Sequence, residues 1–145
     1  MLKHILLAVD QAEDIDSTIA LVAAMAQAFG SEVSVYHARE RVVGASSTAE
    51  QELIHESFQF GEDIAERLRA REVKAVALVD SSRPDRLADH VLAHAEATGA
   101  ELIVIGGHHA HSVRERVLGD IGKELAHRSI CPVLLMPSAA GAQTA

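Results

Sequence analysis

Five short apolar runs recur along the 145-residue chain, with longer helical patterns between them. Each run has the length of a strand, and several are nearly continuous in valine, isoleucine and leucine, which is typical of parallel strands covered on both faces. A strict alternation of strand and helix places helices on both sides of a parallel sheet through right-handed crossovers. The sequence therefore predicts a three-layer, doubly wound α/β domain with a five-stranded parallel sheet. The expected strands are Ile5–Val9, Val33–His37, Val73–Val79, Leu102–Ile105 and Val133–Met136.

Capping residues and glycines mark the ends of the expected helices. Between Ile15 and Phe29, apolar residues recur in steps of four and three, and Gly30 follows where a helix would end. A later helix has Ser82 as its expected N-cap and Gly99 at its end.

A longer helix is expected between these two. The sequence Ser47-Thr-Ala-Glu50 is a capping box that would open it. Its apolar face is expected to comprise Leu53, Ile54, Ser57, Phe58, Gly61, Ile64, Ala65 and Leu68.

Charge and cysteine content restrict the partners and the compartment. The chain has 21 acidic and 13 basic residues, a formal net charge of −8. This balance argues against binding to nucleic acid or to an anionic membrane, because both require a basic face. The one cysteine, Cys131, excludes an internal disulfide and fits a reducing cytosol. The first apolar run stops at Asp10, too early for a secretory signal. We therefore expect a cytoplasmic protein.

Two loops are the expected ligand site. In a doubly wound sheet, ligands bind beyond the carboxyl ends of the strands, where the strand order reverses. This places the site in the loops after Val9 and Ile105. The second loop begins like a glycine-rich phosphate loop, since residues 106–122 are GGHHAHSVRERVLGDIG. Three histidines then stand where further glycines would be expected.

Three segments resemble the signatures of the universal stress protein family: Lys3-His-Ile-Leu-Leu-Ala-Val-Asp10, Leu102-Ile-Val-Ile-Gly106 and Cys131-Pro-Val-Leu-Leu-Met136. Their spacing fits the family over residues 2–137. The resemblance implies a single domain over residues 1–137 with a Rossmann-like fold of the adenine nucleotide alpha hydrolase type. It also implies the strand order 3-2-1-4-5 and, usually, a homodimer. The Ala-rich residues 138–145 are expected to be a flexible tail.

Members of this family that bind ATP carry a glycine, two residues, a second glycine, nine residues, and a third glycine followed by serine or threonine. Here the pattern falls on Gly106, His109, Gly119 and Asp120. Histidine hinders both the positive φ and the close backbone approach that glycine offers a phosphate. We expect Asp120 to be the N-cap of the last helix, where its charge would repel a phosphate. By resemblance, an ATP site would comprise Val9, Asp10, Ile105, Gly106, His109, Gly119, Asp120 and Ile121.

The resemblance also points to a subgroup. Gly107-His108-His109 resembles the Gly-His-His of the universal stress protein A subgroup, which lacks the nucleotide loop. We therefore predict a non-catalytic stress-response protein with no cofactor, acting as a homodimer on unknown protein partners. His109 and Asp120 are expected to close the pocket. The alternative is a nucleotide-dependent switch or weak ATPase that binds ATP with Mg²⁺.

The histidines have a further interpretation as metal ligands. His108, His109 and His111 could bind a metal, but adjacent residues point apart and the loop has no cysteine or carboxylate at a ligand spacing. His90 and His94 are four residues apart, as in a zinc pair, but the glutamate of a His-Glu-x-x-His motif is missing. We expect the first three histidines to lie in a solvated loop and the other two on a partly exposed helix face. Neither group is expected to bind a metal.

The last strand predicts self-association. In the implied strand order it is an edge of the sheet, and an apolar edge offers unpaired backbone groups. Pro132 and Pro137 would limit pairing to the residues between them. A monomer with a short, protected edge strand is the alternative. The residues expected to pair with a second copy, antiparallel around a two-fold axis, are Val133, Leu134, Leu135 and Met136.

Overall fold

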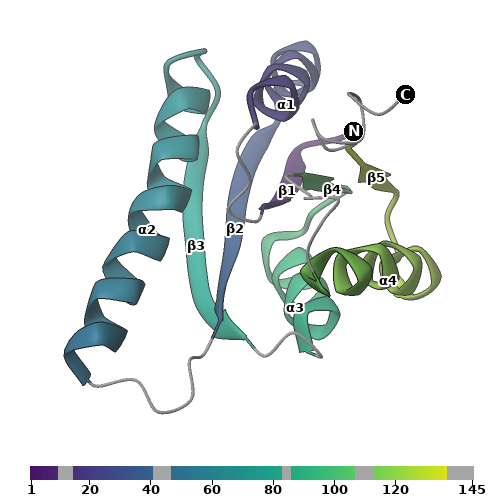
Figure 1. The fold of residues 1–145 in the computed structure, drawn as a ribbon. Coiled ribbons are helices and arrows are strands. Elements are labelled where there is room, and N and C mark those ends of the chain that lie inside the picture. Colours follow the sequence, from purple (N-terminus) through teal and green to yellow (C-terminus); the bar gives the residue numbers. More distant parts are fainter. Residues whose placement is uncertain (10–14, 41–46, 83–85, 107–112, 137–145) are drawn as a thin grey trace, which may run out of the picture.

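The computed structural model describes residues 1–9, 15–40, 47–82, 86–106 and 113–136. Strands and helices alternate along the chain (Figure 1), as the sequence predicts. The strands are β1 (His4–Val9), β2 (Glu32–Glu40), β3 (Ala75–Ser82), β4 (Leu102–Gly106) and β5 (Val133–Leu135). The helices are α1 (Asp16–Phe29), α2 (Ser47–Arg69), α3 (Leu87–Thr98) and α4 (Val113–Arg128).

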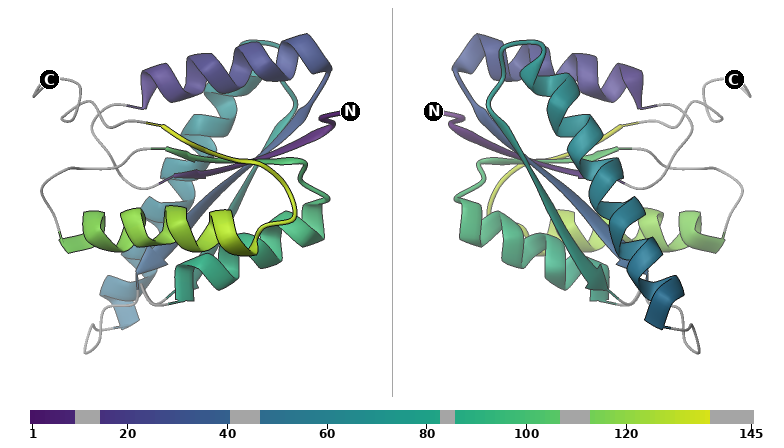
Figure 2. Two further views of the ribbon diagram at one scale, coloured as in Figure 1. Left: turned by 90° about the vertical axis from the view of Figure 1, so that its right-hand side faces the viewer. Right: turned by 90° about the vertical axis from the view of Figure 1, so that its left-hand side faces the viewer.

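The strands form one parallel sheet in the order β3-β2-β1-β4-β5, which confirms the expected topology. Helices α1 and α2 cover one face, and α3 and α4 cover the other (Figure 2). In the central strand, Val9 lies opposite His37 of β2 and Gly106 of β4. The strand order reverses at β1, so a ligand is expected to bind at the carboxyl ends of β1 and β4.

The core consists of two clusters, one on each face of the sheet, because successive strand side chains point to opposite faces. The cluster under α1 and α2 includes Ile5, Leu7, Val35, Ile19, Val22, Ile64 and Leu68. The cluster under α3 and α4 includes Leu6, Tyr36, Ile103, Ile105, Val91 and Leu125.

The predicted helix ends are partly confirmed. Gly30 and Gly99 follow α1 and α3 with φ of 68° and 70°, the left-handed conformation that favours glycine. The prediction that Ser82 caps α3 is wrong, because Ser82 is still paired with Glu40 in the sheet and α3 begins only after Arg86. Strands β2 and β3 continue into polar residues because ladder hydrogen bonds do not require apolar side chains.

Two other boundaries differ from the prediction. Helix α2 begins at Ser47, the residue expected to precede it as the N-cap. Strand β3 begins at Ala75 rather than Val73. The N–H of Val73 donates to the carbonyl of Leu68 at 3.1 Å, so this residue belongs to the turn that closes α2.

Three side chains expected on buried helix faces are exposed. The exposed fraction is 54% for Phe29, 47% for Ile54 and 51% for Phe58. Phe29 is the last residue of α1, Ile54 lies in the amino-terminal half of α2, and Phe58 is the middle residue of that helix. Within the described part of the chain, no helix is long and apolar enough to cross a membrane.

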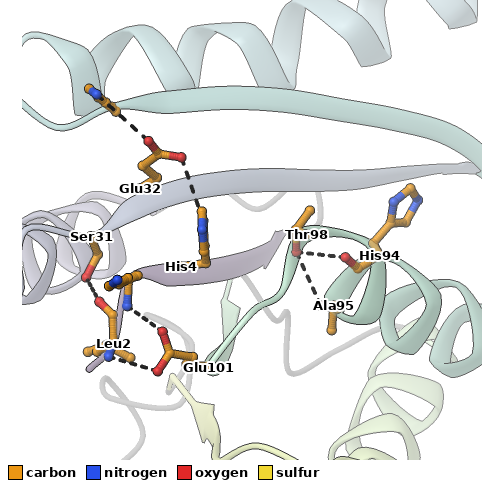
Figure 3. Close-up of polar contacts among 10 residues, drawn as sticks. Leu2, His4, Ser31, Glu32, His94, Ala95, Thr98 and Glu101 are labelled. Atoms are coloured by element: carbon orange, nitrogen blue, oxygen red, sulfur yellow. Dashed lines mark hydrogen bonds and ion pairs between the residues drawn. The ribbon is translucent and has the colours of Figure 1, made fainter.

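Polar contacts join the amino ends of the central strands (Figure 3). The carboxylate of Glu101, just before β4, accepts hydrogen bonds from the backbone N–H of Leu2 at 3.0 Å and of Lys3 at 2.6 Å. These bonds hold the pKa of the Glu101 carboxyl below its usual value. The hydroxyl of Ser31 donates to the carbonyl of Leu2. These contacts brace the amino ends of the central strands, opposite the carboxyl ends where a ligand is expected.

Candidate functional site

The carboxyl ends of β1 and β4 meet at Val9 and Gly106, which are paired in the sheet. Thr18 of α1 lies directly against Gly106. A Cβ atom added to this glycine would stand 2.7 Å from Cγ2 and 3.2 Å from Oγ1 of Thr18. Thr18 is buried and β-branched, so its side chain is stiff and cannot easily turn aside. Packing between α1 and β4 therefore requires a glycine at position 106, independently of any phosphate.

His37 also lies at the carboxyl ends of these strands, and it was not predicted from the sequence. It is buried in β2 opposite Val9, and its Nδ1 lies 3.1 Å from the carbonyl oxygen of Val9. A carbonyl oxygen only accepts, so Nδ1 carries the proton in this contact. The His37 ring packs edge-to-face on Phe60 of α2, with centroids 4.8 Å apart. Parallel alignment of the first two expected strands would have placed His37 beside Val9.

Much of the expected nucleotide loop lies outside the described residues. This holds for the aspartate that follows β1 and for the histidine-rich segment that follows β4. Their proposed roles stay predictions. The residues concerned are Asp10, His108, His109 and His111.

The end of the expected loop lies inside α4. This helix runs without interruption from Val113 to Arg128, so the prediction that Asp120 is its N-cap is wrong. In a helix interior, each N–H bonds to the carbonyl four residues earlier. The N–H groups of Gly119 and Asp120 are therefore used within α4. Ile121 is buried in the same core cluster as Ile105.

A second polar cluster joins β2, β3 and α3. Asp80 Oδ2 lies 3.2 Å from His90 Nδ1 and 2.8 Å from His94 Nε2. Asp80 Oδ1 accepts a hydrogen bond from the hydroxyl of Tyr36 at 2.6 Å. The His94 ring also packs on Tyr36, with centroids 4.5 Å apart. The spacing of the two histidines is visible in the sequence, but their shared carboxylate comes from another element.

These hydrogen bonds set the protonation of the cluster. Burial raises the pKa of the Asp80 carboxyl, but hydrogen bonds from Tyr36, His94 and His90 together outweigh it, so the pKa lies below its usual value. Burial, followed by the hydrogen bond and charge of Asp80, raises the pKa of Tyr36. At neutral pH the carboxyl is ionised and the phenol is protonated. Among the described residues, no group of three or more His, Cys, Asp or Glu could hold a metal ion.

Strand β5 is the edge expected for self-association, although it ends one residue earlier than predicted, at Leu135. The N–H of Ile103 donates to the carbonyl of Pro132 at 3.0 Å, and the N–H of Met136 donates to the carbonyl of Ile105 at 2.8 Å. These two bonds show which backbone groups of β5 face β4 and which face outward.

Alternate residues of a parallel strand bond to the same neighbour. Leu134 therefore faces β4, whereas Val133 and Leu135 direct their N–H and C=O groups outward. The Leu135 side chain is 50% exposed and its Cδ1 packs over Gly122 of α4, where an added Cβ would stand only 2.9 Å away. Ile130, just before the strand, is fully exposed.

The sheet order, which reverses at β1, and the helices on both faces (Figure 2) define a doubly wound, Rossmann-like α/β protein. Residues 1–137 match the model of the Universal stress protein family. The chain belongs to the universal stress protein family. A universal stress protein of Thermus aquaticus is 34% identical to it over 145 residues, covering 94% of this chain and 99% of the relative.

Solved structures show the same fold. A universal stress protein family member from Burkholderia pseudomallei has a TM-score of 0.73 at 20% identity, covering 94% of this chain and 97% of its own. The universal stress protein from Archaeoglobus fulgidus in complex with dAMP has a TM-score of 0.65 at 18% identity, covering 94% of this chain and all of its own. Identities this low support the fold alone.

Proposed function

We propose that this universal stress protein is a cytoplasmic, non-catalytic stress-response protein that acts as a homodimer on protein partners and does not bind ATP. The observation that carries the proposal is the apolar edge of β5, whose outer side pairs with no other residue in the described part of the chain. Its outward backbone groups belong to Val133 and Leu135, and its flank includes the exposed Ile130. An edge of this kind favours pairing with another strand.

A second copy of the chain fits this edge. In an antiparallel pair around a two-fold axis beside Leu134, Val133 of each copy lies opposite Leu135 of the other. Residues opposite one another in this way exchange both of their N–H···O bonds. The contact is isologous, so it closes after two copies and does not extend into a fibre.

The course of α4 supports the absence of ATP binding. In the family pattern, the third glycine and the following hydroxyl residue hold the phosphates. The corresponding Gly119 and Asp120 lie within the helix, where their N–H groups are already bonded. The chain also has a carboxylate in place of the hydroxyl and His109 in place of the second glycine. A carboxylate near a phosphate is repelled by several kcal/mol at an effective dielectric constant of about 20.

One observation favours the alternative, a nucleotide-dependent switch or weak ATPase that uses ATP with Mg²⁺. The similar Archaeoglobus fulgidus protein holds dAMP, and this chain keeps Gly106 beside Val9 at the switch point. The packing of Thr18 accounts for that glycine without a nucleotide.

Isothermal titration of the nucleotide-free protein with ATP and Mg²⁺ separates the two functions. A separate sample of the purified protein is first denatured, and the released material is checked for co-purified nucleotide. We expect no co-purified nucleotide and no binding at submillimolar concentrations. Submillimolar binding that is lost in Gly119→Ala would overturn the proposal in favour of the switch.

Sedimentation equilibrium at micromolar concentration tests the homodimer. We expect a single species of twice the 15.5 kDa chain mass. A species at the chain mass across the concentration range would rule out the dimer.

A further inference from the structure

We draw no further inference here: the strongest candidate, the outer face of α1, where Leu21 and Phe29 are exposed and the sequence from Ser17 to Phe29 has no charged residue, is an apolar helix face, and nothing in the described part of the chain shows what covers it.

Discussion

At Gly106, the side chain of Thr18 leaves no room for a Cβ atom. We expect Gly106→Ala to lower the free energy of unfolding by about 1–3 kcal/mol, the usual cost of overpacking a buried site. Thr18→Ser in the same chain should recover part of the loss, because it removes Cγ2, the nearest atom. Urea unfolding of the four proteins of this double-mutant cycle, without nucleotide, measures the coupling. Purely additive effects would show that Thr18 is not the reason for the glycine.

The carboxyl of Asp80 has a pKa below its usual value, so the folded state favours its ionised form. Its contribution to stability is therefore present above the pKa of an unfolded aspartate, about 4, and is lost as the pH falls through the lower folded value. We expect Asp80→Asn to cost roughly 1 kcal/mol at neutral pH, with a difference from wild type that narrows below about pH 4. Urea unfolding between pH 3 and 7 checks this, with the exposed Asp63→Asn as control. A difference that is constant over that range would contradict the assigned role of the charge.

Single residues were predictable where one local rule decides them. Gly30 and Gly99 end helices in a conformation that glycine favours, and both were found from position alone. The contacts of His37 and of Asp80 were not found, because each joins residues from different elements. Such contacts depend on strand register and on helix rotation, which a local pattern does not contain.

At the level of elements, the sheet order was predictable but several ends were not. The start of α4 is the clearest case. Asp120 followed by an apolar residue is typical of a helix start, yet the helix begins at Val113. The residues from Val113 to Leu118 include good helix formers and no proline, and Gly119 costs only about 1 kcal/mol within a helix. The helix therefore continues through the glycine, and the local capping signal is overridden.

The two leucines of β5 should respond differently to the same substitution. Leu135 is half exposed at the outward edge, so Leu135→Lys should weaken the homodimer at least about tenfold while the monomer stays folded. Leu134 packs against the core cluster under α1 and α2, so Leu134→Lys should destabilise the fold itself, by about 2–5 kcal/mol. Sedimentation equilibrium and urea unfolding of both variants separate the effects. Equal loss of stability in the two would mean that Leu135 is held by the monomer's own packing.

At the scale of the whole molecule, the sheet has two edge strands, β3 and β5, with different properties. The β5 edge is short and apolar, with an exposed isoleucine beside it, whereas the β3 edge is longer and has Arg69 of α2 bonded to the carbonyl of Ala75. Self-pairing at β5 would leave β3 unobstructed, because the two strands lie at opposite edges of the sheet.

The outward groups of Val133 and Leu135 also specify how two copies should align. With the two-fold axis beside Leu134, each copy uses both outward residues, and four hydrogen bonds join the sheets. An axis beside Leu135 would instead place Val133 opposite Pro137, which has no N–H to donate. In the favoured alignment, Leu134 lies opposite its own copy at a non-hydrogen-bonded position, where Cα atoms are about 4.5 Å apart and a disulfide can form.

Leu134→Cys in a Cys131→Ser background should therefore form a disulfide-linked dimer under mild oxidation, detected by non-reducing electrophoresis. Val133→Cys in the same background is the matched control. It should cross-link much less, because in this alignment Val133 lies opposite Leu135 and two residues away from its own copy. If Val133→Cys links more efficiently than Leu134→Cys, the two-fold axis lies beside Val133 rather than Leu134, and the pairing of the two strands is shifted by two residues.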